Sequence, residues 1–231
     1  INGAAVFSGA GGGATNIDRL TDGHYNATSL SVGLGTGALA SEDVSSTRYN
    51  VAVGKDALYA NSTGYRNTAS GYYALKSNTT GGGNTASGYQ ALYNNTTGDT
   101  NTACGSRSLF SNTTGFYNTA SGYESLYSNT TGYNNTASGY QALYKNTTGY
   151  SNTATGSSAL YSNTTGHSNT ASGQQALNLN TTGYSNAATG RYALNNNTTG
   201  TYNIGIGYNA NSTSATVSGQ CTLGDANISN L

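Results

Sequence analysis

The sequence predicts an all-β fold, a parallel β-solenoid of 17-residue rungs. Three observations predict it. A repeat that opens on Asn recurs ten times at intervals of seventeen residues, from Asn50 to Asn203. Gly stands at two fixed places in each full copy while Pro is absent, which suits turns between uninterrupted backbone ladders. The Gly, Asn, Thr and Ser content of each copy disfavours a helix. Equal copies therefore indicate one unit stacked on itself, with matching side chains in columns.

The chain divides into three expected segments. Residues 1–30 are Gly-rich and are expected to be irregular. A degenerate first copy begins near Ser31, and the last copy opens at Asn203, so the solenoid is assigned to residues 31–211. Residues 212–231 have a different composition and are assigned to a C-terminal tail.

The commonest copy reads N-T-A-S-G-Y-x-A-L-Y-x-N-T-T-G-Y-x. We expect two short extended segments in it, Thr-Ala-Ser before Gly71 and Ala-Leu-Tyr before the Asn-Thr-Thr-Gly turn. Gly71 and Gly81 are expected at positive φ, where a Cβ would clash. Ala columns should adjoin the column of large aliphatic residues, which consists of Leu58, Leu75, Leu92, Leu109, Leu126, Leu143, Leu160, Leu177 and Leu194.

We expect the array to have capping rungs at both ends and several copies of the chain to associate. Val51, Val53, Ile204 and Ile206 replace the usual Thr and Ser, and we expect them to seal a narrow interior as capping rungs do. One Leu and two Ala in each copy bury little apolar area against the conformational entropy of seventeen ordered residues. We therefore expect the chain's partner to be itself, in a parallel homotrimer.

Composition disfavours several classes of protein. The formal net charge is zero and 7% of residues are charged, so no basic surface for nucleic acid is expected. No apolar run reaches the roughly 18 residues of a membrane span, and no membrane insertion is expected. Cys104 and Cys221 should lie roughly 30 Å apart along the stack, too far for a disulfide. The chain has no Met and shows no secretory signal, so we expect a processed product or a piece of something longer.

The residues that carry chemistry do not cluster in the sequence. His24 and His167 are far apart, and the acidic residues are scattered, with only Glu42 and Asp43 adjacent. The Gly-rich run at residues 9–13 lacks the Lys of a phosphate-binding loop. We therefore expect no catalytic residues, no metal site and no cofactor, and we do not expect an enzyme.

The phrase N-T-A-S-G-Y-x-A-L-Y-x-N-T-T-G resembles repeats of bacteriophage tail-fibre proteins and related bacterial surface proteins. Many of these end in an S74-type intramolecular chaperone, and residues 208–211, 217–218, 222–225 and 228–229 resemble the stretch that precedes it. More loosely, the rungs are similar to the heads of trimeric autotransporter adhesins. The resemblance implies a trimeric β-helical shaft or head at the virion surface or outside the cell, where it meets a host receptor, either a glycan or a protein.

Two sets of residues are candidate sites. Tyr side chains in columns are candidates for stacking on sugars, with packing between rungs or chains as the alternative: Tyr65, Tyr72, Tyr89, Tyr123, Tyr133, Tyr140, Tyr150 and Tyr184. Asn residues in N-x-[ST] sequons are candidates for glycosylation, with turn chemistry and an amide ladder as the alternative: Asn61, Asn78, Asn95, Asn112, Asn129, Asn146, Asn163, Asn180 and Asn197.

The leading functional hypothesis is a fibre or adhesin module that presents a receptor-binding surface. Two alternatives remain. The repeated Thr68-Ala69-Ser70 unit would give two columns of hydroxyl groups, as an ice-binding solenoid requires. A chain of identical rungs would also suit a self-assembling extracellular filament.

Overall fold

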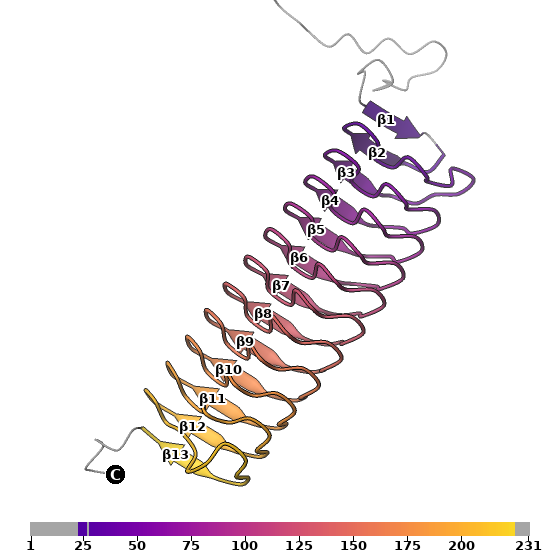
Figure 1. The fold of residues 1–231 in the computed structure, drawn as a ribbon. Helices are drawn as coiled ribbons and strands as arrows, with labels where there is room; N and C mark the ends of the chain where they lie inside the picture. The colour runs from indigo at the N-terminus through magenta and orange to yellow at the C-terminus, as the bar shows by residue number, and fades with distance from the viewer. Residues whose placement is uncertain (1–22, 27, 225–231) are drawn as a thin grey trace, which may run out of the picture.

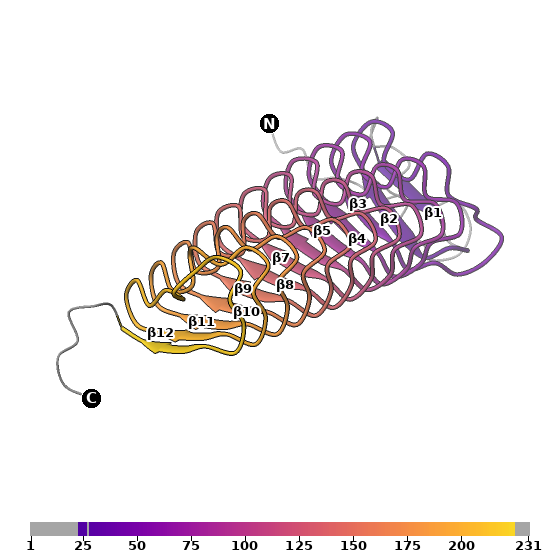
Figure 2. The same cartoon turned by 60° about the horizontal axis from the view of Figure 1, so that its bottom comes forward.

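The computed structural model describes residues 23–26 and 28–224 of the chain, and it confirms the predicted fold class. The described residues form an all-β solenoid without a helix. A 13-stranded sheet follows the chain order from β1 to β13 along the whole rod (Figure 1). Seen obliquely from the end, the coils wrap around a narrow interior (Figure 2).

Every coil contributes one short strand to this sheet. The strands are β1 Gly23–Asn26, β2 Ser31–Leu34, β3 Val51–Val53, β4 Thr68–Ser70, β5 Thr85–Ser87, β6 Thr102–Cys104, β7 Thr119–Ser121, β8 Thr136–Ser138, β9 Thr153–Thr155, β10 Thr170–Ser172, β11 Ala187–Thr189, β12 Ile204–Ile206 and β13 Cys221–Leu223. Only β1 pairs antiparallel, with β2, among the described strands. From β3 to β13 each residue faces its equivalent seventeen positions away, as Ala120 faces Ala137. The repeat therefore fixes the register of the sheet.

The second extended segment that we predicted is absent from the coils. The Ala-Leu-Tyr stretch forms turns, because its Leu adopts a left-handed conformation, with φ of 51° at Leu126. The residue two positions earlier is also left-handed, with φ of 53° at Glu124. These conformations cost energy for residues with a side chain. They persist because the Leu126 N–H donates to the Ala142 carbonyl of the next coil at 3.0 Å while the Leu126 side chain is fully buried.

The two repeated Gly positions have different causes, and one of our predictions was wrong. Gly71 has φ of +142°, as expected. Gly81 does not lie in the left-handed region, and its place is restricted by space instead. A Cβ there would collide with the Gly98 carbonyl oxygen of the next coil and would lie 2.6 Å from Asn78 Oδ1. Gly81 is required because two coils meet too closely for any side chain.

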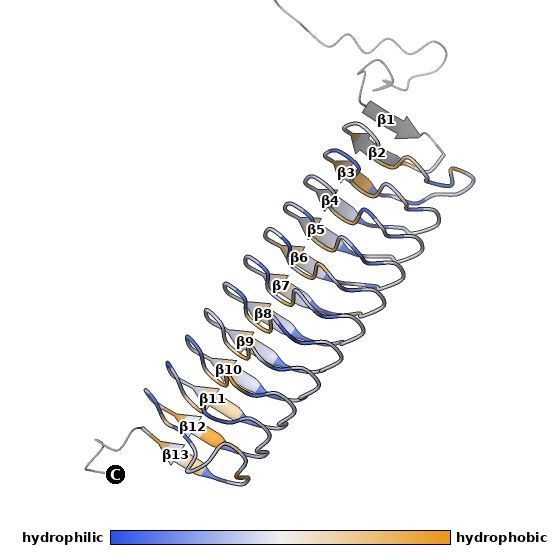
Figure 3. Ribbon diagram, in the orientation of Figure 1, coloured by the Kyte–Doolittle hydropathy of each residue, from blue (hydrophilic) through white to orange (hydrophobic). Residues whose placement is uncertain are grey.

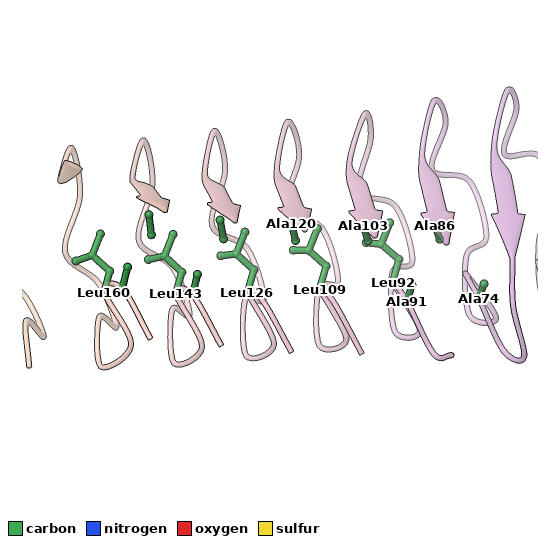
Figure 4. Close-up of a cluster of buried hydrophobic side chains, with 14 of the residues drawn as sticks. Ala74, Ala86, Ala91, Leu92, Ala103, Leu109, Ala120, Leu126, Leu143 and Leu160 are labelled. Carbon is green, nitrogen blue, oxygen red and sulfur yellow. The ribbon is translucent and has the colours of Figure 1, made fainter. Parts of the chain in front are cut away.

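The interior is divided into an apolar half and a polar half. The apolar half is the predicted Leu column with its two flanking Ala columns, all fully buried (Figure 4). Ser108 and Ser125 replace Ala in two coils, and each hydroxyl donates to a carbonyl oxygen of its own coil. No Tyr is among the buried residues of the described coils. Leu is therefore the only large side chain of the apolar core, as predicted.

The polar half contains two columns of fully buried Asn side chains. In the turn Asn ladder, Asn61 to Asn197, each Nδ2 from Asn78 onward donates to Oδ1 of the preceding coil, as at Asn129 and Asn112 (2.8 Å). This ladder confirms the predicted amide stack. The opening Asn ladder, Asn50 to Asn203, was not predicted. There Oδ1 accepts the next coil's backbone N–H, and Nδ2 donates to a Gly carbonyl, as for Asn135 and Gly149 (2.8 Å). No buried side-chain polar atom lacks a partner in the described part of the chain.

The sheet continues beyond both ends of the segment assigned to the solenoid, residues 31–211. β1 pairs with β2 inside the segment that was expected to be irregular up to residue 30, whereas residues 1–22 lie outside the described residues. β13 extends the sheet into the expected tail. At the first coil the buried carboxylate of Glu42 accepts from Asn50 Nδ2 at 2.6 Å and from the Ser31 hydroxyl at 2.8 Å. A carboxylate suits this end because Asn50, the first amide of the opening Asn ladder, donates its Nδ2 proton to it.

Candidate functional site

The outward face of the sheet is the most regular surface of the molecule. In β3 to β12 the first and third residues are exposed while the second is buried. We call this surface the strand face. Over most of its length it carries a column of Thr next to a column of Ser or Thr, with Cys104 in the second column. Strand pairing spaces these side chains by about 4.8 Å along the rod.

The apolar residues at the ends of the array lie on this face and do not seal the interior. Val51 and Val53 are each 41% exposed, Ile204 is 42% exposed and Ile206 is 49% exposed. Our prediction was wrong because a three-residue strand turns only its middle residue inward. The strand face thus has a hydroxyl-rich middle and an apolar patch at each end, which the hydropathy colouring displays on β3 and β12 (Figure 3).

Aromatic side chains form two stacked columns outside the coil. The lateral column contains half-buried rings with centroids 5.1–5.3 Å apart, namely Tyr93, Phe110, Tyr127, Tyr144 and Tyr161. The edge column follows the Asn-Thr-Thr-Gly turn with centroids 4.7–5.0 Å apart, namely Phe116, Tyr133, Tyr150, His167 and Tyr184. Within a stack the ring faces are occupied by neighbouring rings. Tyr133, Tyr150 and Tyr184 therefore offer mainly their edges to a ligand.

The remaining Tyr candidates are more accessible. Tyr72 and Tyr89 stack at 5.6 Å, and Tyr123 and Tyr140 stack at 5.5 Å. These four rings are 39–52% exposed. Ser106 interrupts the column between the two pairs, so each pair has an outer ring face without a ring neighbour in the described coils. Tyr65 is 49% exposed and stacks on no other ring in the described part of the chain.

The edge column is broken in two successive coils, and a pocket lies at this break. Gly82 and Asp99 occupy the positions that hold aromatic rings in later coils. The resulting cavity of about 300 Å³, which we call the edge notch, is lined by Tyr65, Arg66, Gly82, Gly83, Asp99, Thr100 and Tyr117. Sequence reasoning missed it, although the Gly82-Gly83 pair departs visibly from the repeat.

The sequon Asn residues are all inside the coil. Each is fully buried, and its Nδ2 donates to a Gly carbonyl three residues later, as Asn95 does to Gly98 at 3.0 Å. A glycan on Nδ2 would remove this donor and would need space where adjacent coils touch. The fold therefore supports turn chemistry and laddering as the role of these residues, in preference to glycosylation.

Tyrosine ionisation is affected by this arrangement. Burial in the lateral column raises the pKa of Tyr144 above its usual value. A hydrogen bond with Glu124 raises the pKa of Tyr123. Both shifts favour the neutral phenol of these two residues.

The reactive side chains remain separated. Cys104 and Cys221 are free and exposed. His167 lies between Tyr150 and Tyr184 in the edge column, so it serves as a ring in a stack. Within residues 23–26 and 28–224, no three His, Cys, Asp or Glu side chains gather as a metal site would require. The same residues contain no helix with the length and apolarity to cross a bilayer.

Comparison with known proteins gave no match among family models, curated proteins or solved structures. The resemblance to tail-fibre repeats consequently stays a prediction.

Proposed function

We propose that this chain is a structural fibre or adhesin module, a tail-fibre shaft or head at a virion or cell surface, which associates in parallel with copies of itself. One observation carries the proposal, namely the pair of exposed apolar patches at opposite ends of one otherwise hydroxyl-rich face (Figure 3). Exposed apolar patches on a rigid surface favour contact with another surface.

The patches match each other when a second copy lies alongside in register. Val51 and Val53 then meet their own counterparts at one end, and Ile204 and Ile206 meet theirs at the other. The intervening Thr and Ser side chains exchange hydrogen bonds across the contact or through water. Three copies around a common axis, as predicted from the sequence, bury all three strand faces.

Replacing the end residues by those of the repeat itself tests this proposal. The variant V51T/V53S/I204T/I206S carries the side chains that central coils already hold at these positions, so it should fold normally. Analytical ultracentrifugation should find a trimer for the parent chain and a monomer for the variant. As a matched control, Tyr140→Ser removes an exposed ring from another column, where Ser106 and Ser157 already occur, and should leave the trimer intact. A parent chain that sediments as a monomer would overturn the proposal.

Cys104 reports the orientation of the copies. It lies on the strand face in β6, off the centre of the array, so it meets another Cys104 only in a parallel, in-register contact. Mild oxidation should therefore produce Cys104–Cys104 cross-linked dimers from the assembled trimer, and Cys104→Ser should abolish them. In an antiparallel contact β6 would face β9, and no such cross-link would form.

Ice binding is a second candidate, and the exposure of the hydroxyl columns favours it. The strand face presents Thr and Ser side chains at regular spacings of about 4.8 Å along the rod and about 6.6 Å across each strand. Ice binding needs this face free, whereas association covers it. Inhibition of ice recrystallisation by the parent chain, with loss in T119K, would support this candidate over the fibre module.

A self-assembling filament differs from both candidates in length. Negative-stain images should show rods of uniform length for the proposed module, and filaments of unlimited length for a matrix protein.

A further inference from the structure

The edge notch lies where two successive coils lack the aromatic residue that the edge column has in most other coils. In later coils each ring of the edge column covers the next, but Gly82 provides no ring and Asp99 provides a carboxylate. The Tyr65 ring leans toward the position that a ring would fill, since a Cβ built on Gly82 would lie 2.9 Å from Tyr65 Cε1. The break therefore leaves an aromatic surface beside a small cavity.

The notch is rigid because three backbone hydrogen bonds between successive coils support it. The Gly83 N–H donates to the Tyr65 carbonyl, the Thr100 N–H to the Gly82 carbonyl, and the Tyr117 N–H to the Asp99 carbonyl, at 2.9–3.1 Å. Asp99 Oδ1 also accepts the Gly82 N–H at 2.7 Å, which orients the carboxylate. Binding here would order few additional groups and would lose little conformational entropy.

The chemistry of the notch suits a neutral sugar. Tyr65 and Tyr117, 49% and 57% exposed, provide apolar rings whose negative faces attract the C–H groups of a pyranose. Asp99 and Thr100 offer hydrogen-bond partners to hydroxyl groups, and Arg66 offers donors. The Arg66 guanidinium carbon lies 6.0 Å from the Tyr65 ring centroid, so its donors are close to the ring that lines the notch.

We propose that the edge notch is a binding subsite for a single neutral hexopyranose unit of a glycan. Its volume of about 300 Å³ is at the small end of ligand sites, which extend from about 300 to 1,000 Å³. The formal charges of Arg66 and Asp99 cancel, so an uncharged ring is preferred over a uronic acid. A neutral sugar would be the ligand of the receptor-binding role proposed above, and this subsite rests on that role.

Saturation-transfer NMR on the full chain tests this subsite with methyl β-D-glucopyranoside and methyl β-D-galactopyranoside as probes. A single sugar residue should bind with a Kd on the order of millimolar. Methyl β-D-glucuronide should bind more weakly than both neutral probes. No saturation transfer from either neutral glycoside at concentrations up to about 50 mM would overturn the proposal.

Filling the notch provides the decisive variant. Gly82→Tyr places in the column the residue that it holds at Tyr133 and Tyr150, so the chain should fold and binding should be lost. Thr201→Tyr is the matched control, because it adds a ring to the same column far from the notch and should leave binding unchanged. Equal binding by Gly82→Tyr and the parent would show that the sugars contact the array elsewhere, which contradicts the subsite.

Two further substitutions separate the aromatic and polar contributions. Tyr65→Ala should weaken binding by about fivefold or more, whereas Tyr65→Phe keeps the ring and should retain binding. Asp99→Asn keeps an oxygen for the Gly82 N–H but loses the charge, and should weaken binding by about three- to tenfold. These experiments measure sugar binding only. An absence of binding would not change the ultracentrifugation test of the trimer, and a monomeric chain could still bind sugar at the notch.

Discussion

At the scale of single residues, two amide ladders decide whether the coils can stack. Each interior Asn uses both its oxygen and its nitrogen, so neighbouring coils are linked by side chains as well as by the backbone. Because these amides are fully buried, their hydrogen bonds are not in competition with water. The polar half of the core thus specifies register while the Leu column contributes apolar burial.

Asn129 offers a direct test of the turn Asn ladder. Its Nδ2 donates to Asn112 Oδ1 and to the Gly132 carbonyl. Asn129→Asp would place a buried carboxylate against these two acceptors, and we expect it to lower the free energy of unfolding by about 3–5 kcal/mol at pH 7. Asn129→Ala should cost less, because it leaves unpaired groups without adding a charge.

Chemical denaturation at several pH values distinguishes these variants. The buried carboxyl that Asn129→Asp introduces should have a raised pKa, so part of the lost stability should return as the pH falls and the carboxyl becomes a donor. Asn134→Asp, at an exposed position of the same region, should be nearly neutral. An Asn129→Asp variant as stable as the parent would show that the ladder contributes little.

Gly115 tests the close approach of adjacent coils. A Cβ there would collide with Asn112 Oδ1 and with the Gly132 carbonyl oxygen. We expect Gly115→Ala to destabilise the fold by about 2–4 kcal/mol in urea denaturation. Gly83→Ala is the matched control, since the nearest atom to its Cβ would be 3.4 Å away and Arg66 and Thr100 fill the equivalent position. Because Gly83 has φ of +68°, its Ala carries only the left-handed backbone strain of about 1–2 kcal/mol and should cost less than Gly115→Ala.

At the scale of the element, each coil combines one strand with turns that contain left-handed residues. The strand supplies the sheet, and the turns direct Leu126 and its equivalents inward at positive φ. Aromatic stacking outside the coil adds contacts between the same turns. The coil is stable in this conformation only when another coil lies on each side of it.

The lateral column predicts a loss of stability at alkaline pH. Because burial raises the pKa of Tyr144 above about 10, the folded chain holds its phenolic proton more tightly than the unfolded chain does. This contribution is complete below about pH 10 and is lost as the pH rises through the folded pKa. The melting temperature, followed by circular dichroism, should therefore be unaffected by this group up to about pH 9 and should fall as the pH rises above about pH 10.

Removing the phenol isolates this contribution. Tyr144→Phe should show a smaller alkaline decrease, because the ring remains in the stack without an ionisable group. Tyr89→Phe, in an exposed column, should behave as the parent does. If Tyr144→Phe lost stability at alkaline pH as steeply as the parent, ionisation in the column would not be the cause.

At the scale of the whole molecule, the rod behaves as a one-dimensional stack. Coils contact only their neighbours, so stability is expected to be a sum of coil and interface contributions. Removal of residues 135–151 deletes one complete period and joins equivalent positions. The shortened chain should fold with the same circular dichroism spectrum and a melting temperature within about 5 °C of the parent.

A deletion one residue longer is the control for this prediction. Removal of residues 135–152 also takes away Asn152 and leaves a coil of sixteen residues without its member of the opening Asn ladder. That variant should unfold at a clearly lower temperature or in two steps. Equal stability of both deletions would contradict a strict seventeen-residue register.

The sequence by itself determined the period, the parallel stack, the Leu column and the turn Asn ladder, because identical copies leave no other partner for each side chain. It did not determine the left-handed Leu turns, since Leu rarely adopts positive φ and only contacts between coils compensate the strain. Tertiary structure also decided that Val51 and Ile204 point outward, because the direction of a side chain depends on which strand residue faces the interior. The edge notch arises in the same way, from a missing ring whose neighbours are one coil away rather than adjacent in sequence.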